Sequence, residues 1–254
     1  YSVIVEDSQQ EGFATNKYRS LRGNYDTRRK INLTSYPTGV LDCFIKKYTP
    51  EWLSDGISKE AMDKFNIRYS ISQNKIIIPH YAARDGSLIG IRGRALNERD
   101  IEQFGKYMPV QIENKWYSHP LSLNLYGLYE NKENIKKSGI VYLAEGEKSV
   151  LQAESFSKPN CTVAVCGSQF NKYQLNLLLE LCSPREIVIC FDKEELEGSN
   201  AYFDKLWKIG QKYKQYCQFS FIYDRNNLLN MKDSPFDKGE NIFKQLLKGR
   251  VMVK

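Results

Sequence analysis

Histidine is scarce in this chain of 254 residues, which holds only His80 and His119. Two histidines offer few candidates for a histidine-based metal site or a catalytic triad. We therefore expect both side chains to be structural hydrogen-bonding groups. The six cysteines include no C-x-x-C pair, so the sequence offers no zinc ribbon. Free cysteines within apolar runs are typical of a protein in a reducing setting, so we expect a cytoplasmic location in a bacterial host cell.

Long apolar runs and phosphate-loop motifs are also missing. No run approaches the 18 apolar residues of a membrane-spanning helix, and no G-x-x-x-x-G-K-[ST] loop is present. Tyr1 opens the chain without a methionine or a charged and apolar leader. We therefore expect a piece of a longer protein that carries no signal peptide and has no membrane partner.

Positive charge is in excess, with a formal net charge of +7. Residues 1–138 hold 21 Lys and Arg against 16 Asp and Glu, so most of the excess lies in the first half. Lysine and arginine release counterions from nucleic acid on binding, so this bias favours a phosphate-backbone partner. Many soluble proteins carry a similar charge for solubility alone.

The first half has a mixed pattern. Residues 1–35 are polar and weakly periodic, which is typical of a linker or arm. Residues 36–138 predict an α+β subdomain, in which a helical pattern covers Leu41 to Phe65 and Ser58 is placed to cap a helix. Two strand-like stretches follow in residues 74–96, around the turn Arg84-Asp85-Gly86-Ser87.

The pattern changes after a polar stretch at 130–138. Short β-branched runs then alternate with helical periodicity, which predicts a layered α/β domain with a parallel sheet over residues 139–254. The expected strands cover 140–144, 161–166, 186–191 and 217–223, and the expected helices 147–156, 171–181, 200–213 and 240–247.

Acidic residues follow three of these strands. Glu145 comes after the first, Asp192 and Glu194 after the third, and Asp233 and Asp237 after the fourth. The carboxyl ends of parallel strands meet at one edge of a sheet, where clustered carboxylates repel one another and attract a divalent cation. One acid in such a place is usually a helix cap or a solvated loop charge, but three such groups together predict a Mg²⁺ site.

These residues carry a resemblance to a known family. The segments VYLAEGEKSV, CFDKEE and CGSQFNKYQLNLL resemble the Toprim domain shared by DnaG-type primases, topoisomerases and some nucleases. The flanking segments IIIPHYAARDGSLIGIRGRAL, KYMP and LYGLYE are similar to the primases specifically, and KDSPFDKG resembles a variant in phage and mobile-element primases. The matches keep the order of the family from about residue 40 to residue 248.

The resemblance implies a fold of the α/β class. This is a Toprim Rossmann-like parallel sheet with helices on both faces, preceded by a smaller basic α+β subdomain. The sequence departs from the family's pattern at two positions. Ser149 stands where the family usually has aspartate, and Glu194 stands for the second aspartate of the usual Asp-x-Asp. The zinc-binding module that usually precedes this core is missing from the chain.

The resemblance also implies an activity. It is that of a DNA primase, an RNA polymerase that joins ribonucleoside triphosphates into short primers on a single-stranded DNA template by two-metal nucleotidyl transfer. Mg²⁺ or Mn²⁺ would be the cofactor, with no zinc, and a replicative helicase would bind through regions outside this chain. The implied catalytic residues are Glu145, Asp192 and Glu194, the implied metal ligands are these three with Asp233 and Asp237, and the implied nucleotide or template contacts are Arg92, Arg94 and Lys106.

Several alternatives stay open at this point. Arg92 and Arg94 share one face of a strand and could simply be solvated or paired. Tyr107 and Tyr126 could stack on bases, although packing is their commoner role. A Toprim nuclease would use the same acids to cleave a phosphodiester bond with water. A decayed, non-catalytic module that only holds single-stranded DNA is the other alternative, which the change at Ser149 favours.

Overall fold

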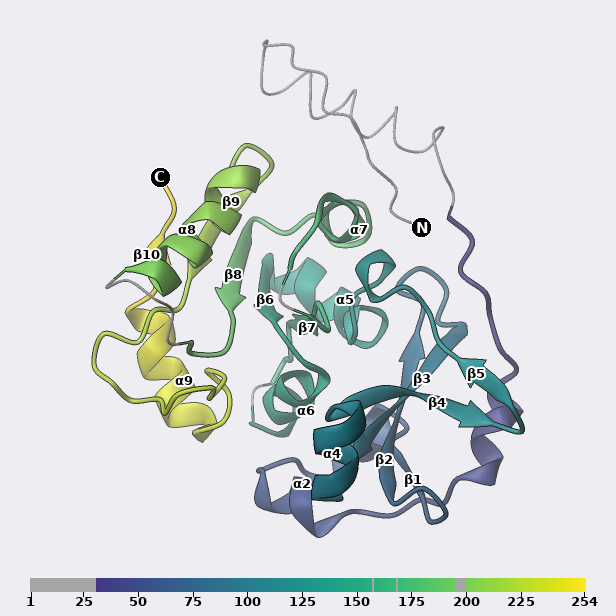
Figure 1. The fold of residues 1–254 in the computed structure, drawn as a ribbon. Helices are drawn as coiled ribbons and strands as arrows, with labels where there is room; N and C mark the ends of the chain where they lie inside the picture. The colour runs from purple at the N-terminus through teal and green to yellow at the C-terminus, as the bar shows by residue number, and fades with distance from the viewer. Residues whose placement is uncertain (1–30, 157, 168, 195–199) are drawn as a thin grey trace. The chain divides into compact units, whose positions relative to one another are not determined.

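The computed structural model describes residues 31–156, 158–167, 169–194 and 200–254. Most of the segment 1–35, expected to be a linker or arm, lies outside these residues. Leu33–Lys254 form one compact unit. Within it the chain has a mixed α/β fold with two five-stranded sheets, which confirms the predicted class at this level (Figure 1).

The first sheet is antiparallel and follows chain order. Its strands are β1 (Arg68–Ser70), β2 (Lys75–Tyr81), β3 (Leu88–Ala95), β4 (Tyr107–Ile112) and β5 (Lys115–Tyr117). The predicted hairpin of residues 74–96 is confirmed as β2 and β3, and Ile76 lies opposite Arg94 in its register. In the turn, Asp85 Oδ1 accepts the Ser87 backbone N–H at 2.9 Å, and Gly86 takes the left-handed φ of +75° that favours glycine.

The helical pattern predicted from Leu41 to Phe65 is confirmed in part, because residues 44–48 are not helical. It contains three short helices, η1 (Thr38–Cys43), α2 (Pro50–Ser54) and α3 (Lys59–Lys64). Thr49 is extended because it precedes Pro50, and Ser58 is extended because it caps α3. The predicted cap is confirmed, since Ser58 Oγ accepts the Ala61 backbone N–H at 3.1 Å.

The second sheet has the strand order β10-β9-β8-β6-β7. The strands are β6 (Ile140–Ala144), β7 (Thr162–Ala164), β8 (Glu186–Cys190), β9 (Gln218–Phe221) and β10 (Val251–Met252). The first four pair in parallel and correspond to the four predicted strands, whereas the antiparallel β10 was not predicted. The chain runs from β6 to β7 on one side and then to β8 on the other, so the strand order reverses between β6 and β8. Ligands of open α/β sheets bind beyond the carboxyl ends of the strands at such a reversal.

Helices follow each parallel strand. They are α6 (Glu147–Phe156), α7 (Lys172–Leu181), α8 (Ala201–Tyr213) and α9 (Gly239–Lys248), close to the predicted ranges. Asn171 caps α7, because its side chain accepts the Gln174 backbone N–H. The helix α6 packs on β6 and β7, and α8 packs on β9.

No element was predicted for the polar stretch 130–138. It belongs to a helix, α5 (Leu128–Ser138), whose buried residues Leu128, Asn131 and Ile135 recur at helical spacing. Gly127 and Gly139 bound this helix in left-handed conformations. Two further helices, α4 (Glu98–Phe104) and the short η2 (Leu121–Leu123), were not predicted.

One hydrophobic core cluster joins the two sheets. It contains Trp52, Phe65 and Ile76 from the first half together with Leu151 and Phe236 from the second. The two halves therefore bury apolar surface against each other. Among the residues that the structure describes, no helix is long and apolar enough to span a membrane.

Candidate active site

Glu145 and Asp192 lie where the strand order of the second sheet reverses, directly beyond the ends of β6 and β8. Burial, and then the negative charge of Asp192, raise the pKa of Glu145 to about 7. Burial, and then the charge of Asp237, raise the pKa of Asp192 to about 6. Glu145 Oε1 is buried and accepts no hydrogen bond. Both carboxylates lie beside other acids and Glu145 Oε1 lacks a donor, which is the environment that a divalent cation relieves.

Glu194 already has a cationic partner. Lys205, on α8, places its Nζ 2.6 Å from Glu194 Oε2. The same Nζ lies 3.9 Å from Glu145 Oε1, too far to donate a hydrogen bond to it. Lys205 therefore neutralises Glu194 and contributes a weaker attraction to Glu145.

Asp237 also has a cationic partner. Its Oδ1 lies 2.6 Å from Lys148 Nζ and accepts a hydrogen bond from Gln152 Nε2 at 3.0 Å. Burial opposes ionisation, but the hydrogen bonds from Lys148 and Gln152 hold the pKa of Asp237 below its usual value. Asp237 is thus ionised and close enough to act on Asp192.

Asp233 is held within its own loop. Its Oδ2 accepts the Asn230 backbone N–H at 2.9 Å and lies 3.2 Å from Lys238 Nζ. The structure thus places Asp233 in a capping and pairing role, whereas Asp237 faces the acidic edge. Among the described residues, no three of the five predicted acids converge closely enough to bind one ion without rearrangement.

Basic side chains border this acidic edge. Arg94 Nη2 lies 3.8 Å from Asp55 Oδ2, and its Nε is buried with no hydrogen-bond partner. Burial, and then the charges of Arg94 and Lys148, lower the pKa of Lys106. Lys148 also lies 3.7 Å from Asp55. Arg94, Lys106 and Lys148 form a basic cluster with an excess of positive charge and one unused donor.

Arg92, two residues from Arg94 on β3, has partners of its own. Its Nη1 donates to Glu147 Oε1 at 2.5 Å, and its Nη2 donates to the Tyr107 carbonyl oxygen at 3.4 Å. The side chain of Arg92 is 15% exposed and that of Glu147 is 1% exposed. Arg92 was predicted to contact nucleotide or template, but its guanidinium is engaged with a buried carboxylate.

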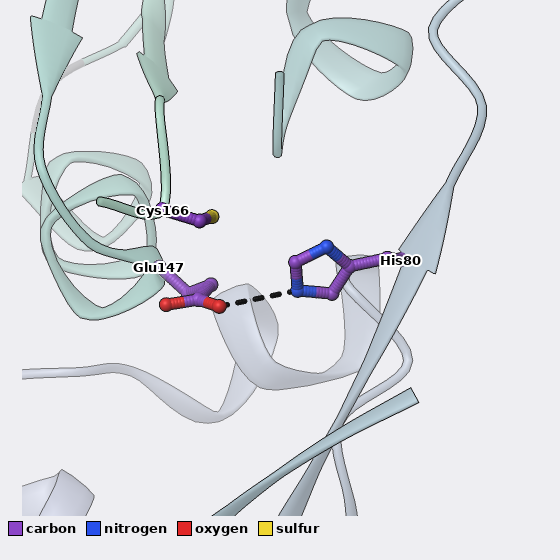
Figure 2. A group of neighbouring side chains, drawn as sticks. All are labelled: His80, Glu147 and Cys166. Carbon is purple, nitrogen blue, oxygen red and sulfur yellow. Dashed lines mark hydrogen bonds and ion pairs between the residues drawn. The ribbon is translucent and has the colours of Figure 1, made fainter. Parts of the chain in front are cut away.

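His80, Glu147 and Cys166 form the one group of three potential metal ligands found in the described part of the chain (Figure 2). His80 Nε2 lies 3.2 Å from Glu147 Oε1. Burial opposes ionisation of Glu147, but the hydrogen bond with His80 and the charge of Arg92 hold its pKa at about 2. Because Arg92 supplies the counter-charge, this group requires no metal ion to be stable.

The remaining predicted residues have packing roles. His119 Nε2 lies 3.0 Å from His80 Nδ1, in keeping with the expectation that both histidines are structural. Tyr126 is 3% exposed and packs against Phe65, so it offers no ring to a base. Ser149, in the place of the family's aspartate, is buried within α6.

Four residues of this region were missed from the sequence: Lys148, Glu147, Lys205 and Asp55. Glu147 and Lys148 directly follow the Glu145-Gly146 pair at the start of a predicted helix, so their nearness to the site could have been anticipated. Lys205 and Asp55 come from a distant helix and from a loop. No local pattern marks them.

A curated protein is similar to most of this chain. No protein family profile matches the chain. Over 247 residues the chain is 33% identical to the SPbeta prophage-derived uncharacterized protein YorJ of Bacillus subtilis, covering 91% of this chain and 65% of YorJ. The chain thus spans just under two thirds of the length of that relative.

Several solved structures of primases are similar to this chain. The DnaG primase catalytic domain bound to single-stranded DNA has a TM-score of 0.62 at 16% identity, covering 85% of this chain and 77% of the other. The Aquifex aeolicus primase, with its zinc-binding and RNA polymerase domains, has a TM-score of 0.60 at 21% identity, covering 80% and 55%. The E. coli primase catalytic core has a TM-score of 0.56 at 16% identity, covering 80% and 72%. The resemblance predicted from the sequence is confirmed: this chain has the fold of the DnaG primase catalytic core, and its curated relative is a prophage protein.

Proposed function

We propose that this chain is the RNA polymerase core of a DNA primase, which synthesises short RNA primers on single-stranded DNA. The observation that carries the proposal is the buried, unpartnered Oε1 of Glu145 beside Asp192, at the sheet edge where the strand order reverses. A buried carboxylate oxygen without a donor is costly unless a cation binds it. The donor set there is carboxylate oxygen alone, which suits Mg²⁺ or Mn²⁺.

In this proposal Glu145 and Asp192 would hold the first divalent cation. When bound, such a cation neutralises an incoming triphosphate and lowers the pKa of a primer 3′-hydroxyl. The pair Asp237 and Glu194 would complete a two-metal site after exchanging their lysine partners for metal. Asp233 would support the loop of Asp237 from the outside.

The basic cluster would bind the phosphates. Arg94 has an unpaired Nε and can hold a phosphate through two donors, while Lys106 and Lys148 act as point charges. Bound between this cluster and the acids, a triphosphate would have its α-phosphorus oriented toward the primer. Arg94 and Lys106 would therefore determine the affinity for nucleotide or template.

The larger architecture in this proposal is that of the primases. Residues 36–138 would form the basic α+β subdomain, and residues 139–254 a Toprim domain whose Rossmann-like sheet has helices on both faces. The template would be single-stranded DNA, as in the complex of the similar DnaG domain. Ribonucleoside triphosphates would be the substrates, and a replicative helicase would bind elsewhere in the full-length protein.

Two observations favour a second candidate, a non-catalytic module that binds single-stranded DNA. Lysines pair with three of the five acids, and Ser149 replaces a sixth. A Toprim nuclease is the third candidate, since it would use the same acids and produce shortened strands. The three candidates differ in product rather than in binding.

Incorporation of labelled ribonucleotides tests the proposal. The chain would be incubated with Mg²⁺ or Mn²⁺ on a single-stranded DNA template, with and without a preformed primer, beside Glu145→Gln and Asp192→Asn. Glu133→Gln, at an exposed position of α5, is the matched control. We expect extended RNA from the parent and the control and at least a hundredfold loss in both site variants, in line with the effect of removing a group that stabilises the transition state.

The products also separate the alternatives. Shortened template strands without RNA would replace the primase by a nuclease. Template binding without any product, in both metals and with a primer supplied, would favour the non-catalytic module.

A further inference from the structure

Four buried or partly buried side chains form a connected network beside the acidic edge: Arg92, Glu147, His80 and His119. Arg92 donates to Glu147 at 2.5 Å, His80 Nε2 lies 3.2 Å from the same oxygen, and His119 Nε2 lies 3.0 Å from His80 Nδ1. We call this set the anchoring network. It connects β2 and β3 of the first sheet to the first residue of α6. Figure 2 shows the part of the network formed by His80 and Glu147.

The turn that carries Glu145 has little packing of its own. Between Glu145 and Glu147 lies Gly146, and a Cβ atom built on it would meet no atom within 4 Å beyond its chain neighbours. Contacts at Gly146 therefore do not fix this turn. Glu147, two residues from Glu145 and fully buried, is the next point along the chain that is held by other segments.

Glu147 is held in place by strong polar interactions with Arg92 and His80. Glu147 Oε1 receives a charge-assisted bond from Arg92 and contacts the ring of His80, and the exposed fractions of the Glu147 and His80 side chains are both 1%. Charge-assisted hydrogen bonds are about twice as strong as neutral ones, and burial shields them from water. Breaking this contact would leave the Arg92 charge without its partner.

We propose that the anchoring network is a positioning device, which fixes where the Glu145 carboxylate lies relative to Asp192 and to the basic cluster. The inference rests on the proposed function, because it assigns Glu145 to a divalent cation. Arg92 and Glu147 are positioning residues, since neither touches the proposed substrate. Arg92 acts two residues from Arg94 on the same strand, so one network fixes both the acidic turn and the basic strand.

The molecule offers a matched control on the same helix. Glu154 of α6 pairs with Lys64 of α3 at 2.6 Å, so it also joins the first half to α6. It lies seven residues beyond Glu147, or about 10 Å along the helix. If the network only holds α6 against the first half, then loss of either glutamate charge would have the same effect on the site.

The test measures Mn²⁺ binding by electron paramagnetic resonance, which requires no polymerisation. Parent, Glu147→Gln, Glu154→Gln and Arg92→Lys would be compared, with near-ultraviolet circular dichroism to establish that each is folded. We expect the Kd for Mn²⁺ to rise about tenfold in Glu147→Gln, as it does when groups behind metal ligands are changed, and less than about twofold in Glu154→Gln. Arg92→Lys keeps the charge but loses the planar fork, so its Kd should lie between those of the parent and Glu147→Gln.

Equal Kd values in parent, Glu147→Gln and Arg92→Lys would overturn the inference. Equal weakening in Glu147→Gln and Glu154→Gln would also overturn it, because the role would then be general to the helix. If Glu147→Gln does not fold, the Kd values for Mn²⁺ of Arg92→Lys and Glu154→Gln are compared instead. Equal values in these two variants would then overturn the inference. Parent protein that binds Mn²⁺ but makes no RNA would refute the primase activity alone and leave this inference standing.

Discussion

At the scale of single residues, the site is defined by how its charges are paired. Asp237 and Glu194 have lysine partners at 2.6 Å, whereas the lysine beside Glu145 lies 3.9 Å away and Asp192 forms no ion pair within the described residues. Glu145 and Asp192 are the acids of the site whose pKa values are raised. This difference leads to two predictions.

The stability of the metal-free protein should depend on pH through Glu145. The folded state raises its pKa from 4.5 to about 7, so it favours the protonated form. The stabilisation is complete below pH 4.5 and is lost as the pH rises through 7, by an amount on the order of 2 kcal/mol. Urea denaturation in EDTA should thus show a lower free energy of unfolding at pH 8 than at pH 5.5.

Glu145→Gln should flatten this pH dependence, because it removes the titrating group while keeping the shape. Added Mg²⁺ should raise the unfolding free energy of the parent at pH 8 more than at pH 5.5. If the free energy of unfolding of Glu145→Gln changes between pH 5.5 and 8 as much as that of the parent, another group causes the pH dependence.

Lys205 should compete with the divalent cation. Lys205→Gln removes the charge that neutralises Glu194 and partly attracts Glu145, so these acids should bind metal more strongly. We expect a Kd for Mn²⁺ that is about threefold to tenfold lower, measured by isothermal titration calorimetry. Lys208→Gln, on an exposed position of the same helix, changes the net charge equally and should leave the Kd within about twofold. Equal effects of the two variants would indicate a general field rather than a local exchange.

The two unpaired acids could be predicted from the sequence, but their neighbours could not. Glu145 and Asp192 follow short apolar strands, and the geometry of parallel sheets brings such positions together. The pairing of Arg92 with Glu147 depends on two segments 55 residues apart. A strand pattern shows which face Arg92 occupies but not which of several nearby acids it meets.

At the scale of secondary structure elements, strong periodicity determined what could be predicted. The strand Ile140–Ala144 and the helix Glu147–Phe156 have the predicted bounds, because their apolar spacing is regular. The helix Leu128–Ser138 was missed because only three of its positions are buried and one of these is Asn131. A buried polar residue weakens an apolar pattern although it strengthens the packing.

Asn131 should contribute to stability through its two hydrogen bonds. Its Nδ2 donates to the Thr162 carbonyl oxygen at 2.9 Å, and its Oδ1 accepts from Lys64 Nζ at 3.1 Å. Asn131→Ala should lower the free energy of unfolding by about 1–3 kcal/mol, because the Thr162 carbonyl is buried and loses its donor. Lys137→Ala, at an exposed position of the same helix, is the control and should change it by less than about 0.5 kcal/mol. Equal effects of both in urea denaturation would mean that helix propensity, not these bonds, matters.

At the scale of the whole molecule, the basic first half and the acidic edge of the second belong to one packed unit. The core cluster contains residues from both, and the basic cluster draws Arg94 and Lys106 from the first half and Lys148 from the second. A phosphate bound there would contact both halves.

Binding of single-stranded DNA should depend on salt through this cluster. Each phosphate contact that is lost should reduce the slope of log Kd against log salt by about 0.7. We expect Arg94→Ala and Lys106→Ala each to weaken binding and to lower the slope by this amount, measured by fluorescence anisotropy of a labelled oligonucleotide. Lys137→Ala serves again as the control. Full retention of the slope in both variants would place the template elsewhere on the surface.

The link between Arg92 and Glu147 also constrains how this sequence can vary. A change at either position alone leaves a buried charge without its partner, so the two positions should change as a pair among related chains. Chimeras that join the first half of this protein to the second half of a distant relative should be less stable unless residues 92 and 147 come from the same parent. The two halves can therefore not be exchanged independently between relatives, because the ion pair between Arg92 and Glu147 joins them.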